Sequence, residues 1–191
     1  MDNLRELVLK CRSYRRFDES HTIPRETLVE LLGMARCTAS AANMQPLKYI
    51  LSADPETNAR IFPCLGWAGY LKDWAGPVAG ERPTAYIVLL IDESITKKHW
   101  CDDGIAAQTI LLGAVERGLG GCMIGSIKKE TLRSELEIPE HLKIQLIIAL
   151  GKPAETVVLE DLLPGGDIKY WRDENDIHHV PKRMLEELII K

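Results

Sequence analysis

The chain has 191 residues, of which 46% are hydrophobic and 27% are charged, and this composition excludes disorder, collagen and coiled coil. Its 24 Lys and Arg residues against 28 Asp and Glu give a net charge of −4, which argues against a nucleic-acid-binding protein. A chain of this length buries about 70% of its unfolded surface. We therefore expect a single α+β domain over residues 1–191, with a core that needs no disulfide or metal.

Hydrophobic periodicity predicts helices and strands in mixed order. In chain order, we expect a helix at 4–12, a helix at 26–36, a loop at 38–46, a strand at 48–52, a helix at 54–61, a strand at 86–91, a helix at 104–117, a strand at 122–124, a helix at 129–136 and a strand at 143–150. Helices outnumber strands in this prediction. The continuous apolar run at 86–91 is typical of a strand buried on both faces.

Residues 104–117 form the most apolar predicted helix. Asp102 or Asp103 is suited to cap its first turn, and Gly118 to end it. Its apolar residues run around nearly the whole helix surface. We therefore expect this to be the central buried helix.

Two further segments, residues 62–83 and 163–191, lie outside this series of predicted helices and strands. Residues 62–83 place aromatic side chains among four Gly and three Pro, which favours an ordered cover over a substrate, with plain core packing as an equal alternative. Residues 163–191 form a C-terminal extension. It holds a polar turn at 173–176 between short extended pieces and a last helix at 184–190, entered through Pro181.

The five cysteines form no C-x-x-C pair, so we expect free thiols in a reducing compartment. The first residues carry acidic side chains and lack the apolar stretch of a secretory signal. No uncharged apolar stretch is long enough to span a bilayer. The expected location is the cytoplasm, without membrane attachment.

Generic catalytic motifs find little support. The glycines at 118–125 follow a helix and do not match a dinucleotide-binding or phosphate-loop pattern, so helix termination and a tight turn explain them. His99, Cys101 and Asp102 have metal-ligand chemistry but no second cluster completes a site. His178 and His179 are adjacent, so in an extended segment their rings point to opposite faces and cannot share one ion.

A basic cluster, Arg12-Ser13-Tyr14-Arg15-Arg16, offers guanidinium groups that bind phosphate in a bidentate manner. Taken alone, the cluster is better explained as a solvated helix end. A second basic island lies at Lys169 and Arg172. If the fold brings the two islands together, they form an anion clamp on an otherwise acidic protein.

Several motifs together resemble the FMN-dependent nitroreductase family. The matching segments, in order, are Arg12-Ser13-Tyr14-Arg15-Arg16-Phe17, the loop Ser40-Ala41-Ala42-Asn43-Met44-Gln45-Pro46, the helix at 104–118, the turn Gly120-Gly-Cys-Met-Ile-Gly-Ser126 and the strand end Leu150-Gly-Lys-Pro153. The resemblance implies a nitroreductase-like fold, in which helices surround a central, mostly antiparallel sheet. It also implies a homodimer with an extensive interface.

The resemblance further implies FMN as the bound cofactor, with NAD(P)H as reductant. Three groups of residues would contact the flavin. They are Arg12, Ser13 and Arg15 at the phosphate and ribityl chain, with Arg172 and Lys169 closing the phosphate site; Ser40, Ala41 and Asn43 from the other subunit; and Ile124, Gly125 and Ser126 against the ring. Glycine suits a place where backbone approaches a flat ring closely. No side chain is assigned as catalytic and no metal is expected.

The implied reaction is a ping-pong transfer. Hydride would pass from NAD(P)H to the flavin and then to an electron-poor small molecule such as a nitroaromatic or quinone, with Trp67, Tyr70 and Trp74 as the substrate-facing residues. Dehalogenation or flavin fragmentation on the same fold remains an alternative, as does a flavin-binding protein without turnover. Two positions depart from the family pattern: Cys11 replaces a common Arg, and Leu47 a common Trp.

Overall fold

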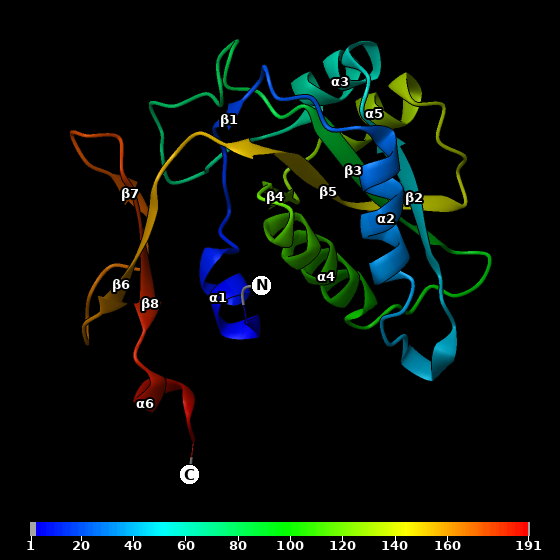
Figure 1. Cartoon of the computed structure of the whole chain (residues 1–191). Helices are drawn as coiled ribbons and strands as arrows, with labels where there is room; N and C mark the ends of the chain where they lie inside the picture. The colour runs from blue at the N-terminus through cyan, green and yellow to red at the C-terminus, as the bar shows by residue number, and fades with distance from the viewer. Residues whose placement is uncertain (1–2, 191) are drawn as a thin grey trace.

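The computed structural model describes residues 3–190, and Figure 1 shows its course. Its α-helices are α1 (Leu4–Lys10), α2 (Arg25–Ala35), α3 (Pro55–Ile61), α4 (Asp102–Glu116), α5 (Lys129–Glu135) and α6 (Leu185–Leu188), with short 3-10 helices at Ala41–Asn43 and Phe62–Cys64. Its strands are β1 (Phe17–Asp18), β2 (Leu47–Ser52), β3 (Ala85–Asp92), β4 (Gly120–Ile124), β5 (Leu142–Pro153), β6 (Val157–Leu162), β7 (Trp171–Arg172) and β8 (His178–Arg183). Strands therefore outnumber α-helices within residues 3–190, contrary to the expectation.

The central sheet is antiparallel throughout, as expected. Its strand order is β1-β5-β3-β2, and β4 also pairs with β5. The long strand β5 holds the sheet together, since Leu150 pairs with Ala85 on β3 and with Gly121 on β4.

Helices cover both faces of this sheet (Figure 1). Alternate residues of β3 point to opposite sides: Ile87 packs with α2 and α4, and Val88 packs with α3 and α5. Every residue of β3 is buried, which confirms the prediction of a strand covered on both faces. Within the described chain, no helix is both long and apolar enough to cross a membrane.

Side-chain caps mark the starts of two of the described helices, α1 and α3. Asn3 and Glu6 form a reciprocal capping box at α1, and the Asp54 carboxylate accepts a hydrogen bond from the backbone N–H of Thr57 at the start of α3. At α4 the expectation is wrong. The helix begins at Asp102, and its N-cap residue is Cys101. No side chain makes a capping hydrogen bond to the backbone at this helix start.

Helix α4 is also less buried than expected. Ala106, Ile110 and Ala114 are fully buried, but Ile105 is 38% exposed and Gln108 on the same face is also exposed. In a single chain, therefore, this apolar helix has one uncovered side.

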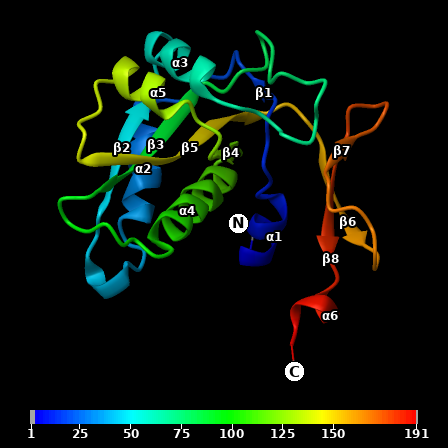
Figure 2. The same ribbon diagram turned by 180° about the vertical axis from the view of Figure 1, so that it is seen from behind.

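The C-terminal extension stands away from the sheet and ends in α6 (Figures 1 and 2). A second sheet forms here, with β6 parallel to β8 and β7 antiparallel to β8. The extended pieces on either side of the polar turn are confirmed as β7 and β8. The prediction missed β6, and it wrongly placed Pro181 at a helix entry: Pro181 lies in β8 beyond the two residues that pair with β7.

Candidate cofactor site

The basic N-terminal segment lies directly on β4. Ser13 forms a parallel bridge with Gly121, and the backbone N–H of Tyr14 donates to the carbonyl of Gly121 at 3.0 Å. A Cβ on Gly121 would meet the carbonyl oxygen of Ala149 at 2.5 Å. The glycine therefore permits this close packing, and the fold joins two of the motifs that carry the family resemblance.

Two guanidinium groups on this segment carry no ion pair within residues 3–190. Arg12 donates to the backbone carbonyl of Val8 at 2.6 Å, and its Nε is buried without a partner. Arg15 donates to the carbonyl of Ser13 at 3.2 Å and stacks over the ring of Tyr170 at 4.9 Å. Two uncompensated cations and an orphaned buried N–H are the donor set that a phosphate group requires.

The end of β4 farther from the Ser13 bridge offers open space. Ile124 is 4% exposed, whereas the next residue, Gly125, is exposed, and a Cβ built on it would meet nothing within 4 Å. The Ser126 carbonyl accepts a hydrogen bond from the backbone N–H of Gly66 at 2.8 Å. A flat group could therefore lie against the Gly125 backbone, so the residues present fit FMN.

Arg172 reaches the same region but is already paired. Its Nη2 donates to the Glu155 carboxylate at 2.9 Å, and the two side chains are only 9% and 1% exposed. Glu155 also accepts hydrogen bonds from the backbone N–H groups of Arg15 and Arg16. The fold thus brings the two basic islands together through a buried carboxylate. Lys169 instead pairs with Asp167 at 2.9 Å, with 60% of its side chain exposed.

The two adjacent histidines face opposite ways, as predicted from the extended segment. His178 is 1% exposed, and its Nε2 lies 3.3 Å from Nη1 of Arg15, which can only donate. Burial, followed by the charges of Arg15 and Arg172, lowers the pKa of His178 to about 4. His178 is therefore neutral at pH 7 and accepts from Arg15 through Nε2.

His179 points to the other side of β8. Its Nδ1 lies 2.6 Å from the Glu160 carboxylate, and its ring stacks on Trp171 with centroids 4.1 Å apart. Burial acts to lower the pKa of His179, but the hydrogen bonds to Glu160 and Asp173 outweigh it and raise the pKa. This histidine therefore joins the three strands of the extension.

The loop at 38–46 is built around a buried carboxylate. The Ser40 hydroxyl and the backbone N–H of Ala41 both donate to Asp102, which is 3% exposed at the start of α4. Asn43, with φ 53°, is one of three non-glycine residues of this loop in the left-handed region. The loop also borders a cavity of about 290 Å³.

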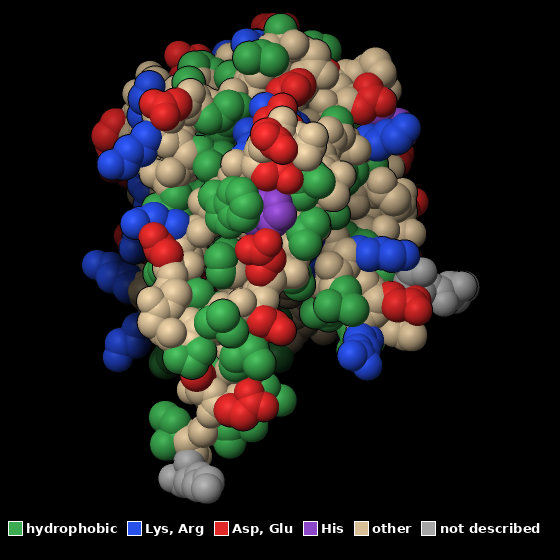
Figure 3. Space-filling model, turned by 90° about the vertical axis from the view of Figure 1, so that its left-hand side faces the viewer, with side chains coloured by type: hydrophobic (Ala, Val, Ile, Leu, Met, Phe, Trp, Pro, Cys, Tyr) green, Lys and Arg blue, Asp and Glu red, His purple; other side chains and the backbone are tan. Residues whose placement is uncertain are grey.

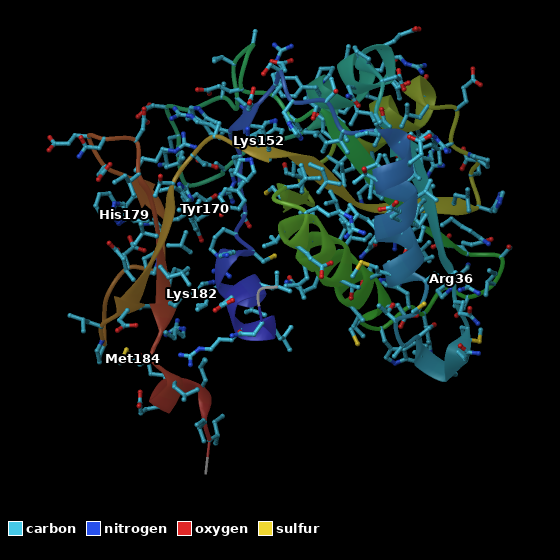
Figure 4. The ribbon with its side chains drawn as sticks, in the orientation of Figure 1. Arg36, Lys152, Tyr170, His179, Lys182 and Met184 are labelled. Atoms are coloured by element: carbon cyan, nitrogen blue, oxygen red, sulfur yellow. The ribbon has the colours of Figure 1, made fainter. Side chains whose placement is uncertain are left out.

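Within one chain, this loop is far from the basic segment. Figure 4 labels Arg36, beside the loop, and Tyr170, beneath Arg15, on opposite sides of the molecule. Ser40, Ala41 and Asn43 therefore do not join Arg12 and Arg15 within a single chain. The expectation that they serve a site on another subunit stays a prediction.

The aromatic residues of segment 62–83 divide into core and surface. Trp67 is 9% exposed and packs in the cluster beneath α3 and α5. Tyr70 is 47% exposed and its ring lies 4.9 Å from that of Tyr170. Trp74 lies under the guanidinium of Arg172 at 4.3 Å. The segment is thus held by the C-terminal extension, whose outer face shows both hydrophobic and acidic side chains (Figure 3).

Glu155, Tyr170 and His178 were not predicted as parts of this region. Each is a single residue without a local pattern, and each finds its partner more than a hundred residues away. The one signal in the sequence is the excess positive charge of the basic cluster, which indicates that a carboxylate from a distant part of the chain lies near it. It does not say which of the 28 acidic residues supplies it.

Comparison with known proteins agrees with this geometry. Residues 8–152 match the Nitroreductase family. A Methanothermobacter thermautotrophicus protein, named for NADH dehydrogenase and NAD(P)H nitroreductase activity, is 31% identical over 164 residues, covering 82% of this chain and 81% of its own. The FMN reductase (NADPH) of Bacillus subtilis is 25% identical, with 86% and 71% covered.

A solved structure shows the same fold. An FMN-dependent nitroreductase from Clostridium difficile R20291 superposes with a TM-score of 0.63 at 23% identity, over 80% of this chain and 88% of that one. Because the family match spans most of the chain, the protein belongs to the nitroreductase family.

Proposed function

We propose that the protein is an FMN-dependent oxidoreductase that takes hydride from NAD(P)H and reduces an electron-poor small molecule, a nitroaromatic or a quinone, in a ping-pong reaction. The observation that carries this proposal is that Arg12 and Arg15, two cations without an ion pair, lie on the segment that packs on the start of β4, while the backbone at Gly125, just past the other end of β4, is open. Relatives named NAD(P)H nitroreductase, FMN reductase (NADPH) and NADPH-flavin oxidoreductase support it. The proposed location is the cytoplasm.

FMN, when bound, supplies the redox chemistry by accepting hydride from nicotinamide and reducing the second substrate. The protein binds and orients. Arg12, Ser13 and Arg15 hold the phosphate and ribityl chain, and Ile124, Gly125 and Ser126 support the ring. Arg172 acts through Glu155, which fixes the backbone of Arg15 and Arg16.

The proposed protein is a homodimer with two shared sites. The uncovered side of α4 at Ile105, 38% exposed, and the apolar residues Leu4 and Val8 of α1, 69% and 45% exposed, would lie in its interface. The loop containing Ser40, Ala41 and Asn43 would then reach the cofactor of the partner subunit. Burial of such a surface is typical of obligate dimers.

Flavin colour and reduction test the enzyme. The purified protein should be yellow, should bleach when NADH or NADPH is added without oxygen, and should regain its colour with menadione. A yellow protein that never bleaches would be a flavin store. A yellow protein that bleaches but releases halide or cleaves flavin would carry out another reaction of the fold, and a colourless one that ignores added FMN would refute the proposal.

Substitution of Arg15 tests the site. One charge-assisted hydrogen bond to phosphate contributes about 1.5–3 kcal/mol, so Arg15→Ala should weaken FMN binding about tenfold or more. Arg60, whose guanidinium donates to the Glu135 carbonyl at 2.9 Å, provides the control, and Arg60→Ala should retain FMN. Unchanged retention of flavin by Arg15→Ala in gel filtration would exclude the proposed site.

A mixed dimer tests the sharing of sites. One chain carries Asn43→Arg, which crowds the partner's flavin, and the other carries Arg12→Glu with Arg15→Glu. Both defects then fall in one site, so the heterodimer should keep roughly one FMN, whereas either mutant homodimer keeps little. A heterodimer with no more flavin than the mutant homodimers would show that each site is built from a single chain.

A further inference from the structure

A cavity of about 250 Å³ opens on the α3 side of the sheet, away from the predicted cofactor residues. Its walls come from the start of β3, from α3 and from the chain just before β3. Arg82, Tyr86 and Glu19 supply its principal polar groups, and Phe62, Pro55 and Ala59 part of its apolar wall. None of the residues assigned to FMN lines this cavity.

Tyr86 brings an unused hydroxyl to the cavity. The residue is 1% exposed and its ring packs in the cluster with Val88 and Leu90. Within residues 3–190 its hydroxyl has no hydrogen-bond partner. Burial raises the pKa of Tyr86, with the nearby Arg82 charge acting in the opposite direction, so the phenol is protonated at neutral pH. The ring is therefore held in the core while the hydroxyl, which lines the cavity, is free to bond to a group that enters it.

Arg82 brings an unpaired cation to the same place. Its guanidinium stacks on the ring of Phe62 at 4.5 Å, and no carboxylate of the described chain lies within ion-pair distance. Glu19, although close, accepts hydrogen bonds from the backbone N–H groups of Gly80 and Arg82 and so fixes the loop. Arg82 and Tyr86 can therefore both donate to one group in the cavity.

Two neighbouring polar side chains, Asn58 and Thr84, are by contrast already hydrogen-bonded within the fold. Asn58 donates to the Thr84 carbonyl at 2.8 Å and accepts from the Ser52 hydroxyl at 2.7 Å. The Thr84 hydroxyl donates to the carbonyl of His21 at 2.9 Å. The unmet hydrogen-bonding capacity of these walls thus comprises one cation, Arg82, and two neutral hydroxyl groups, those of Tyr86 and Thr22, and such a set complements a singly charged anion.

We propose that this cavity is a second ligand site, which binds a small organic monocarboxylate through Arg82 and Tyr86. The apolar part of the ligand packs on Phe62, Pro55 and Ala59. The negative charge of Glu19, which also lines the cavity, disfavours dianions such as phosphate. A volume of about 250 Å³ lies below the ~300–1,000 Å³ of sites for drug-sized molecules, so the ligand carries about one ring.

Benzoate and its neutral isostere benzamide test this site on the full-length protein, loaded with FMN where it binds FMN. We expect benzoate to bind measurably by calorimetry and benzamide not to bind. Arg82→Gln should raise the benzoate Kd about tenfold, and Tyr86→Phe severalfold, because each removes one donor to the carboxylate. Tyr49→Phe and Arg36→Gln are matched controls, since both residues line the cavity beside Ser40, and they should leave the Kd unchanged.

Two further readouts keep the outcome clear. Because the Tyr86 hydroxyl has no partner in the fold, Tyr86→Phe should retain the melting temperature of the unliganded protein; a clear decrease would show that the hydroxyl is already used and would overturn the proposal. Absence of benzoate binding, equal binding of benzamide, or a Kd unaffected by Arg82→Gln and Tyr86→Phe would also overturn it. A change in the flavin spectrum that persists in both variants would place benzoate at the flavin instead. Benzoate binding does not require flavin, so failure of the proposed enzyme function would leave this test intact.

Discussion

Replacement of Glu155 by Gln provides a quantitative test of the buried network that supports the cofactor segment. The Glu155 side chain is 1% exposed and accepts hydrogen bonds from two backbone N–H groups and from Arg172. A glutamine can keep its oxygen on the backbone donors, but its amide N–H groups then face the Arg172 guanidinium, donor against donor. Arg172, only 9% exposed, would keep a buried charge without compensation.

Removal of one partner of a buried ion pair lowers the free energy of unfolding by about 3–5 kcal/mol. For a chain of this size, each kcal/mol lowers the melting temperature by about 2–4 °C, so Glu155→Gln should lower it by about 6–20 °C. Urea unfolding followed by circular dichroism gives the free energy directly. The double variant Glu155→Gln/Arg172→Met removes the stranded charge and should regain much of this loss.

Glu187 supplies the matched control. It pairs with Arg183 at 3.0 Å in the same Glu–Arg chemistry, but these side chains are 33% and 55% exposed. Exposed pairs contribute about 0–1 kcal/mol, so Glu187→Gln should have little effect. Similar small losses for both Gln variants, or a double variant as unstable as the sum of its two single changes, would refute the argument that Glu155 neutralises a buried charge.

Three more predictions concern pH, the aromatic segment and the glycines. The pKa of His178 is lowered to about 4 in the fold against 6.5 when unfolded, so stability should fall as the pH drops from about 6.5 towards 4, and His178→Gln should flatten this dependence of the urea midpoint. Trp67→Ala should cost about 3–5 kcal/mol of stability because Trp67 lies in the core, whereas Trp74→Ala should change the ratio of quinone to nitroaromatic turnover at constant flavin content. Gly121→Ala should destabilise the fold, since its Cβ meets a carbonyl oxygen at 2.5 Å, whereas Gly125→Ala should keep the melting temperature of the flavin-free protein and retain less FMN.

Features with a local cause were predicted well from the sequence. The fully buried β3 follows from its continuous apolar run, and the start of α3 follows from Asp54 and Pro55. The antiparallel sheet and the family itself came from motifs whose order and spacing are preserved. In these cases, the residues that determine the structure are close together in the chain.

Features that depend on distant partners could not be predicted. The phosphate contact predicted for Arg172 stays a prediction, whereas its buried partner Glu155 and the Trp74 ring beside it were not predicted. Helix α6 is only four residues long because Met184 and Ile189 take extended backbone conformations on either side of it. A short apolar segment with little to pack against gains too little from burial to continue as a helix.

Asp102 shows how such long-range bonding changes the interpretation of a motif. Its sequence position favours an N-cap, yet its carboxylate instead accepts hydrogen bonds from Ser40 and Ala41. The loop that it holds contains Ala42, Asn43 and Gln45 at φ near 50°, a conformation that costs non-glycine residues about 1–3 kcal/mol each and persists only where surrounding contacts impose it.

The hydrogen bonds of the Ser40 hydroxyl therefore stabilise the conformation of this loop. It donates to Asp102 and accepts from the backbone N–H of Gln45 at 2.9 Å, which leaves it little capacity for a cofactor. Asn43, at the strained end of the loop and with its side chain in no hydrogen bond within residues 3–190, is better placed to contact a group outside its own chain. The family motif thus combines a residue whose side chain builds the loop with a residue whose unbonded side chain the loop presents, and we expect Asn43 to offer the freer side chain to the flavin of a partner subunit.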